Sequence, residues 1–461
     1  MIRPPYLLVA TVILLSIVPG IVRSNEPAQP PNFIFILSDD QGWSEVSTPM
    51  DPKVPQAASR YFETPNLERM AKAGMRFQSG YSPAPLCTPT RRSIQCGMTP
   101  ARQRGTEFRS TFDWTDRFTL PKALKSVDSD YRCAHFGKYG EQIPVSPEEI
   151  GYDESDGFTG NKTGGCPRDM AERGATFITD DPKLTDSMTA RAVDFIERQV
   201  RDEHPFYVQL SYYAVHLQVQ TRQAMLDKYK KKGQPDRAVT YGFAGMLEEL
   251  DAGVGRIMDT IDRLDIADNT YVIFTSDNGG RGTIPGADES LLPPNRPLAG
   301  AKHSLYEGGI RVPFLAVGPG VEPNSVCHIP VVAYDLLPTV YDLAGGRDPL
   351  PDDIDGASFR SLLENGDAGG VNRPLDALVF HRPLHKRDPQ SAIRVGDWKL
   401  MILWKVRNRE RQRLLFNLAD DIGEKEDLSK QMPQKADQLE TMLINYLQEV
   451  DAEKPKGQGF E

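Results

Sequence analysis

Two apolar runs that each end in polar, mostly acidic residues constrain the fold of this chain most strongly. The first run, Phe33–Leu37, lies in "NFIFILSDD", and the second lies in "TYVIFTSDNGG" and ends at Asp277 and Asn278. Apolar runs without alternation are typical of strands that are buried on both faces, as in a parallel sheet. The sequence therefore predicts at least two central strands, each with polar side chains at its carboxyl end.

Helical patterns separate the expected strands. One helix is expected to begin near Thr64 and end at Gly74, another covers about 184–199, and the clearest runs from Phe243 to Leu264. In the last, apolar residues lie three and four apart. Shorter strands are expected in "RCAHFGKYG" and in "PFYVQLSYYAVH", which ends at His216. This alternation predicts a large doubly wound mixed sheet flanked by helices, an α/β domain over residues 30–350.

The pattern changes after about Pro349. The segments "DALVFH", "SAIRVGDWKLMILW" and "QRLLFNL" predict strands joined by tight turns, one of them at Gly396 and Asp397. An amphipathic helix is expected near the end of the chain, with apolar residues between Leu439 and Val450. Residues 351–461 are therefore expected to form a smaller C-terminal subdomain, an antiparallel sheet plus one helix.

The first 24 residues are typical of an export signal. Arg3 precedes an apolar stretch from Leu7 to Val22, and small residues at Val22 and Ser24 fit the cleavage positions. The stretch is short for a membrane span, although an uncleaved anchor is the alternative. We expect a periplasmic or secreted protein with no stable membrane insertion after signal cleavage.

Charge and cysteine content narrow the function classes. The chain has 54 Lys and Arg against 64 Asp and Glu, a net charge of −10, which disfavours a nucleic-acid partner. A local basic pocket can still accept an anionic substrate. The basic run at 228–233 is expected to be a solvated surface.

The five cysteines are an odd number for an exported protein, and without a C-x-x-C pair a thiolate zinc site is not expected.

Polar residues at the two strand ends suggest a metal site. Asp39 and Asp40 follow the first run, and Asp277 and Asn278 follow the second. In open α/β sheets, sites form at the carboxyl ends of strands, and three carboxylates meeting there would repel one another without a cation. Oxygen ligands favour Ca²⁺ or Mg²⁺. The alternative is that each acid caps the helix that follows it.

The stretch "PLCTPTRRS" places Cys87 close to Arg91 and Arg92. Neighbouring arginines are expected to favour the thiolate of Cys87. The alternative is a structural disulfide, which needs no such neighbours.

The motif "CTPTR", Cys87 to Arg91, is similar to the C-x-P-x-R signature of the type I sulfatases, in the alkaline phosphatase superfamily. Other segments agree with that family in order. "NFIFILSDDQGW" and "TSDNGG" resemble its two metal strands, and "GKYG" resembles its G-K-W-H segment. "LAGAKHSLYEGGIRVP" resembles its lysine-bearing loop, and "AIRVGDWKLM" with "LFNLADDIGEKEDL" its C-terminal subdomain. The resemblance covers nearly the whole chain after the leader.

The resemblance implies a modified residue and a metal. In that family a maturase oxidises the signature cysteine, here Cys87, to Cα-formylglycine, which would leave four cysteines free to pair. It also implies a cation, Ca²⁺ or alternatively Mg²⁺. Its implied ligands are Asp39, Asp40, Cys87, Asp277 and Asn278.

The resemblance further implies hydrolysis of a sulfate ester. The aldehyde hydrate would attack sulfur, and its second hydroxyl would later expel sulfate. Arg91, Lys138 and Lys302 match the positions that hold the sulfate charge. His216 with Lys302 would protonate the leaving alkoxide.

One family position is not matched. Gly140 stands where the G-K-W-H segment has the histidine that deprotonates the hydrate, and Tyr139 replaces the tryptophan. His135 and His303 are the candidates for this base. Strand alternation would turn His135 away from Lys138, which favours His303.

The stretch "FHRPLHKRD" suggests how the substrate is selected. We expect His381, Arg382 and His385, together with His303, to contact a sugar or an acidic glycan, and the alternative is an exposed loop. The substrate would then be a sulfated carbohydrate. Two other functions stay open: a phosphomonoester or phosphonate monoester hydrolase of the same superfamily, and a catalytically silent glycan-binding protein, which the glycine at position 140 would allow.

Overall fold

The computed structural model describes the chain except residues 2–28, 166–174, 408 and 461. The expected signal peptide, apart from Met1, and Cys166 lie outside the described residues. In the described part of the chain, no helix combines the length and the apolar character needed to cross a bilayer.

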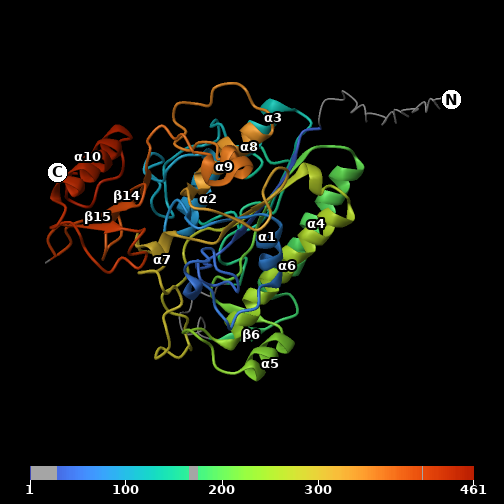
Figure 1. Cartoon of the computed structure of the whole chain (residues 1–461), viewed down its shortest axis with the longest axis horizontal. Helices are drawn as coiled ribbons and strands as arrows, with labels where there is room; N and C mark the ends of the chain where they lie inside the picture. Colours follow the sequence, from blue (N-terminus) through green and yellow to red (C-terminus); the bar gives the residue numbers. More distant parts are fainter. Residues whose placement is uncertain (2–28, 166–174, 408, 461) are drawn as a thin grey trace.

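An eight-stranded mixed sheet forms the centre of the molecule (Figure 1). Its strands lie in the order β11-β2-β10-β9-β1-β7-β4-β5. The five from β9 to β5 are parallel, and β10 joins them antiparallel at β9. The bounds are β1 Asn32–Ser38, β2 Met75–Phe77, β4 Arg132–Gly137, β5 Glu154–Ser155, β7 Phe206–Ser211, β9 Thr270–Ser276, β10 Phe314–Val317 and β11 Ser325–Cys327.

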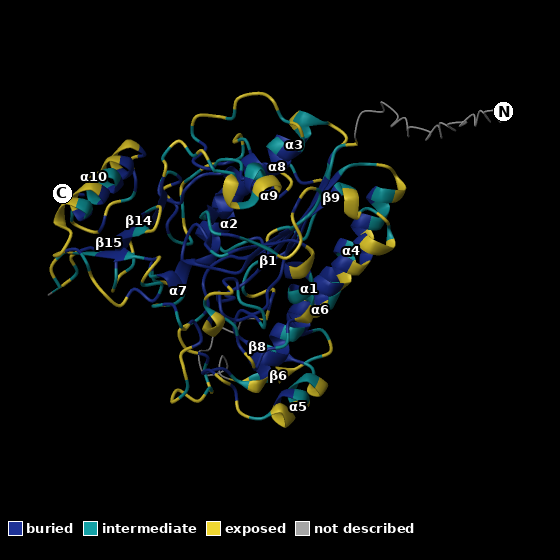
Figure 2. Ribbon diagram, in the orientation of Figure 1, coloured by how far each residue is buried: buried dark blue, intermediate teal, exposed yellow. Residues whose placement is uncertain are grey.

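Helices cover both faces of this sheet because its strands are apolar on both sides. Ile34 and Ile36 of β1 point into a core with α1, α4 and α6, whereas Phe35 and Leu37 point into a second core with α2, α3, α8 and α9. Figure 2 shows β1 buried between the two layers. The helices are α1 Pro65–Ala73, α2 Cys87–Cys96, α3 Leu120–Val127, α4 Thr185–Arg201, α6 Tyr241–Arg263, α8 Leu336–Leu343 and α9 Arg360–Asn365.

The C-terminal subdomain is a four-stranded antiparallel sheet with one helix, α10, beside the large sheet (Figure 1). One face of this sheet packs on Leu439 and Leu443 of α10. The other face packs on Tyr81, Leu305 and Ile310 of the large unit. The bounds are β13 Leu378–Arg382, β14 Gln390–Val395, β15 Trp398–Leu403, β16 Gln412–Asn417 and α10 Pro433–Glu449.

Two short pairs and two small helices complete the described fold. The pairs are β12 Val331–Val332 with β3 Gly80–Tyr81, and β6 Thr176–Ile178 with β8 Val219–Thr221. The helices are α5 Gln223–Lys232 and α7 Glu307–Ile310.

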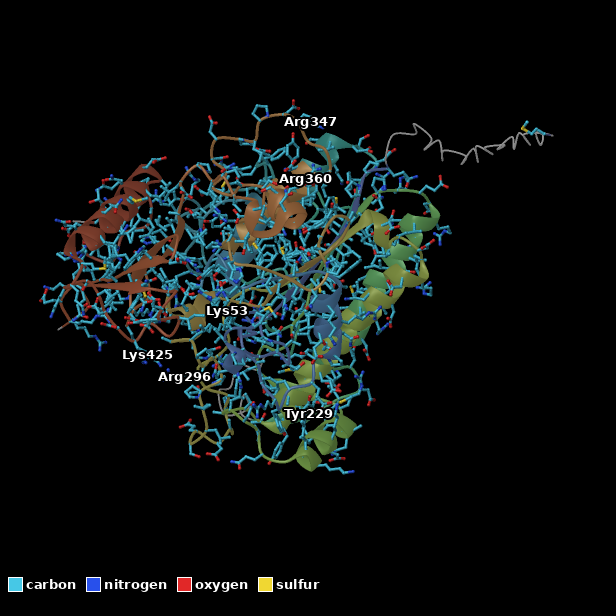
Figure 3. The ribbon with its side chains drawn as sticks, viewed as in Figure 1. Lys53, Tyr229, Arg296, Arg347, Arg360 and Lys425 are labelled. Atoms are coloured by element: carbon cyan, nitrogen blue, oxygen red, sulfur yellow. The ribbon has the colours of Figure 1, made fainter. Side chains whose placement is uncertain are left out.

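The basic run at 228–233 is more than a solvated surface. It lies mostly on α5, where Tyr229, labelled in Figure 3, is buried and packs 5.3 Å from the ring of Tyr61. Lys228 and Lys232 both pair with Glu63. The run therefore fixes α5 to the large unit.

The predicted fold class is confirmed, with three local corrections. The strand expected to end at His216 ends at Ser211, so His216 lies in the following loop. The expected boundary at residue 351 precedes α9, whose Leu362 and Leu363 belong to the core on the large sheet. The described cysteines, Cys87, Cys96, Cys133 and Cys327, are all buried and free, so the expected pairing is not found among them.

Candidate active site

The polar residues at the ends of β1 and β9 meet because the two strands are parallel neighbours. Ser38 pairs with Ser276, so Asp39 and Asp277 follow at the same edge of the sheet. The backbone N–H of Asp40 donates to Oδ1 of Asp277 at 3.2 Å, and the side chain of Asn278 donates to Oδ1 of Asp40 at 2.9 Å. All four side chains are buried. The structure thus brings the predicted oxygen ligands into one cluster.

Each of the three carboxylates has its own cationic partner. Lys138 Nζ lies 2.5 Å from Asp39, and Lys302 pairs with Asp40. Burial alone would raise the pKa of both carboxyls, but Lys138 and Lys302 hold the pKa of Asp39 and Asp40 below the usual range. The cluster therefore keeps its negative charge although it is removed from water.

Arg91 holds Asp277. Its Nε and Nη2 donate to Oδ2 of Asp277 at 2.9 and 2.7 Å, and Nη1 donates to the carbonyl of Lys138. Burial and the neighbouring Asp39 nevertheless raise the pKa of Asp277 to about 6. Arg91 therefore orients the carboxylate of Asp277, and its expected contact with the sulfate group stays a prediction.

Cys87 is the first residue of α2 and lies against this cluster. Its Sγ is 3.6 Å from Nζ of Lys302, and one ligand atom each from Cys87, Asp39 and Asp277 lie within 4.8 Å of one another. The expectation of a favoured thiolate is wrong. Burial raises the pKa of Cys87, and the guanidinium of Arg92 donates to the carbonyls of Gly105 and Glu107 instead.

The residues present fit a divalent cation. Oδ1 of Asp39, Oδ2 of Asp40 and Oδ1 of Asn278 are buried without a hydrogen-bond partner in the described chain. Buried oxygens are normally hydrogen-bonded, so orphaned oxygens of three neighbouring ligand residues indicate a missing partner. An all-oxygen set of this kind suits Ca²⁺ or Mg²⁺.

His216 completes the cluster from the loop after β7. Its Nδ1 lies 2.6 Å from the carbonyl of Leu217, so Nδ1 carries the proton and Nε2 is left as an acceptor. Nε2 lies 3.8 Å from Oδ2 of Asp40. Burial lowers the pKa of His216 to about 3, and the ring is therefore neutral at pH 7.

Comparisons with known proteins agree with this geometry. Residues 31–346 match the family model described as Sulfatase. The human N-acetylgalactosamine-6-sulfatase is 30% identical over 412 residues, covering 82% of this chain and 73% of that protein. This chain belongs to the sulfatase family.

Two further relatives extend the likeness over the whole chain. A sulfatase of Formosa agariphila is 28% identical and covers 88% of this chain and 85% of its own length. The crystal structure of Ps i-CgsB in complex with k-i-k-neocarrahexaose has a TM-score of 0.74 and 27% identity, covering 94% of this chain and 95% of that one. The C-terminal subdomain is therefore shared with a solved structure.

In this sulfatase, His303 follows Lys302 in the same loop and faces His385 of the C-terminal subdomain. Their rings are parallel, with centroids 6.4 Å apart. The backbone N–H of His303 donates to the carbonyl of Pro85, and Arg382 donates to the carbonyl of His303 at 2.7 Å. Arg382 also pairs with Glu107 at 3.0 Å. Arg382 therefore positions the backbone of His303, and the expected contact of His303, Arg382 and His385 with a sugar stays a prediction.

His381 takes no part in this arrangement, in contrast to the expectation. Its Nδ1 lies 2.7 Å from Ser391 Oγ and its Nε2 2.7 Å from the carbonyl of Glu453. The side chain is 2% exposed. With both ring nitrogens engaged inside the subdomain, His381 is a buried structural histidine.

The backbone at Gly140, where the family has a histidine, has a conformation that favours glycine. Gly140 has a φ of +148°, and a Cβ there would lie 2.6 Å from Cδ1 of Ile143. Tyr139 stacks on Trp114, with centroids 6.0 Å apart, and His135 packs edge-on against Tyr139. His135 thus belongs to an aromatic cluster, which leaves His303 as the candidate base.

Sequence reasoning missed Glu107 and Glu307. Glu107 binds Arg382, and Glu307, five residues after Lys302, binds the buried Lys399 of β15 at 2.8 Å. Glu107 lies in no motif that the sequence analysis quotes, and Glu307 lies in the lysine-bearing segment without a spacing that marks it. A buried lysine in the strand "WKLMIL" is the one signal that a partner carboxylate was required.

Proposed function

We propose that this sulfatase hydrolyses sulfate esters of a sulfated carbohydrate, with Cys87 converted to Cα-formylglycine and with Ca²⁺, or alternatively Mg²⁺, as cofactor. The cation ligands would be Asp39, Asp40, Asp277, Asn278 and residue 87. The observation that carries this proposal is the set of three orphaned buried oxygens next to Cys87. When bound, a dication beside a formylglycine hydrate supplies a hydroxyl nucleophile of lowered pKa.

The surrounding side chains would bind and orient the sulfate group. Lys138 and Lys302 supply two ammonium groups from opposite sides of the carboxylates, in a site without bulk water where such charges act strongly. Three cations balance three carboxylates, so a bound dication would supply the net positive charge that attracts the sulfate ester monoanion. Arg91 keeps Asp277 in place beneath them.

Proton transfer would involve Lys302, His216 and His303. Lys302 Nζ lies next to residue 87 and would protonate the leaving alkoxide, whereas His216, whose Nε2 carries no proton, would accept a hydrogen bond at this position. For sulfate release we assign the base to His303, because it follows Lys302 directly and its side chain is exposed.

The substrate class is supported by the relatives. Their names specify N-acetylgalactosamine-6-sulfate for the human relative and a neocarrahexaose complex for Ps i-CgsB, both sulfated or carbohydrate ligands. His303 and His385 would contact the sugar. A formylglycine-generating maturase would be a partner, and the apolar leader supports a periplasmic or secreted location.

The proposal is tested by mass spectrometry and by rates. Protein produced with a maturase is digested with trypsin, and the peptide with residue 87 is expected to show the aldehyde in place of the thiol. The same protein should hydrolyse an aryl sulfate much faster than the matching aryl phosphate, and Cys87→Ala should remove this activity. A faster phosphatase rate would favour the phosphoester reaction, and glycan binding without turnover by modified protein would favour a silent binding protein.

A further inference from the structure

A cavity lies between the loop after α2, the loop after β4 and the C-terminal tail. It has a volume of about 400 Å³ and is lined by Arg104, Arg109, Ser110, Gln142 and Glu453, among others. That volume lies in the range of small-molecule sites, roughly 300–1,000 Å³.

Two short connections join this cavity to the catalytic residues. Thr88, next to Cys87, accepts a hydrogen bond from the backbone N–H of Glu141 at 2.9 Å, and Glu141 precedes Gln142 of the cavity wall. On the other side, Glu107 lies in the loop that carries Arg104 and Arg109 and pairs with Arg382, which holds His303. The cavity wall is therefore connected to the catalytic residues through two short sets of contacts.

One arginine of the cavity, Arg109, has no carboxylate partner among the described residues, although the carboxylate of Glu453 lies in the same wall. Arg109 is exposed, and its one described hydrogen bond goes from Nε to the neutral side chain of Gln142 at 2.9 Å. Arg104, in contrast, pairs with Asp451 at 2.9 Å, and Oε2 of Glu453 accepts hydrogen bonds from Thr106.

A buried arginine adds to this charge from below. Arg92 is 1% exposed, and its Nε and Nη1 have no hydrogen-bond partner among the described residues. A Cβ on Gly105 would lie 3.2 Å from the guanidinium carbon of Arg92 and 3.1 Å from Oγ of Ser110. The guanidinium is thus a neighbour of Ser110 in the cavity wall. Burial lowers the pKa of Arg92 to about 10, and the nearby carboxylate of Glu453 in the cavity wall partly offsets this effect.

We propose that this cavity is an anion subsite, in which Arg109 binds a second acidic group of the glycan, a carboxylate or a sulfate on a neighbouring sugar. The subsite rests on the proposed function, because it selects among sulfated carbohydrates. Arg109 is the ligand, and Arg92 strengthens the local positive field. A chain with a net charge of −10 would otherwise repel a polyanion.

The test compares substrates that differ in the neighbouring charge. Wild type and Arg109→Gln are assayed on p-nitrophenyl sulfate, on a 6-sulfated galactosamine oligosaccharide with a uronic acid neighbour, and on a carrageenan oligosaccharide with sulfates on adjacent sugars. We expect kcat/KM to fall about ten-fold on at least one oligosaccharide, as for loss of one charge-assisted bond, and to stay within two-fold on the aryl sulfate. A loss on the galactosamine oligosaccharide alone indicates a bound carboxylate, and a loss on the carrageenan oligosaccharide alone indicates a bound sulfate.

Two controls make the outcome decisive. Arg109→Lys should keep part of the effect, and Arg201→Gln, at the opposite end of the sheet where α4 ends, should change nothing. Equal losses on all substrates, or no loss on either oligosaccharide, overturn the subsite.

If the wild type turns over no sulfate ester, the proposed function fails. The subsite is then decided by calorimetric binding of both oligosaccharides to wild type and Arg109→Gln, and equal affinities overturn it.

Discussion

His381 is a neutral imidazole inside the C-terminal subdomain. Burial lowers its pKa to about 4, and both ring nitrogens are hydrogen-bonded. The pKa in the folded chain is thus below the unfolded value of about 6.5. As the pH falls, the unfolded chain binds the proton first, so the stabilisation is complete above about pH 6.5 and is lost as the pH falls towards 4.

Replacing this residue should therefore change the pH dependence of stability. At pH 7.5 we expect His381→Gln to lower the free energy of unfolding by about 1–3 kcal/mol through lost hydrogen bonds. At pH 4.5 the gap should shrink, because the wild type alone pays a protonation cost on the order of 3 kcal/mol. Urea unfolding followed by tryptophan fluorescence measures both. The surface variant His328→Gln is the control, and a gap of equal size at both pH values would contradict the prediction.

At the scale of elements, a buried charge cluster joins α7 to the C-terminal sheet. Lys399 of β15 lies 2.8 Å from Glu307 and 2.8 Å from Glu424, and Arg311 lies 2.6 Å from Glu307. The backbone N–H of Glu307 also donates to Glu424 at 2.6 Å. In Figure 1, α7 lies between the two units. Since α7 follows the loop that carries Lys302, the subdomain holds in place the loop to which we assign a catalytic role.

Removing the lysine should damage both stability and catalysis. Lys399→Met leaves two buried carboxylates facing each other, which costs about 3–5 kcal/mol. The double variant with Glu424→Gln should be more stable than the single one, because one of the repelling charges is gone. Urea midpoints and kcat/KM on an aryl sulfate measure the two effects. A single variant with unchanged stability and activity would show that the cluster does not hold the loop.

The strands and helices that could be predicted are those whose apolar run or helical periodicity is complete within their own residues. The strands β1 and β9 and the helix α6 are long and regular, and their positions match the expectation. The strand β7 ends at Ser211, and the apolar residues that follow it keep hydrogen bonds to the end of β1, as in the bond from the Tyr212 N–H to the carbonyl of Leu37. The strands β2, β10 and β11, of three or four residues, are too short to show a period.

The same distinction separates the predicted and unpredicted parts of the site. Asp39 and Asp277 could be placed because parallel strands end at one edge. The stack of His303 on His385 and the pair of Arg382 with Glu107 join segments that are remote in sequence, so spacing gives no signal for them. For β13, alternation divides "LVFHR" into two faces but does not show which face meets the site. The sequence therefore predicts the same role, contact with a sugar, for both His381 and Arg382.

At the scale of the whole molecule, the catalytic cluster connects segments from four parts of the chain. Asp39 ends β1, Cys87 begins α2, Asp277 ends β9, and Lys302 lies in the loop before α7. A cation bound to Asp39, Cys87 and Asp277 would cross-link segments of the chain that are far apart in the sequence. Because the unfolded chain cannot present these ligands together, the binding free energy becomes folding stability.

Calcium should accordingly raise the unfolding temperature even when no catalysis is possible. The Cys87→Ser variant, freed of metal with a chelator, is expected to gain about 2.7 kcal/mol at a Ca²⁺ concentration 100 times the Kd. Calorimetry with and without Ca²⁺ measures this gain, and Mg²⁺ serves as the competing ion. Adding Asp277→Asn should abolish the gain, because it removes a ligand charge and leaves Arg91 unpaired in the cluster. Asp259→Asn, on the exposed face of α6 and paired with Arg69, is the matched control and should keep it. A gain that persists without the Asp277 carboxylate would place the cation elsewhere in the molecule.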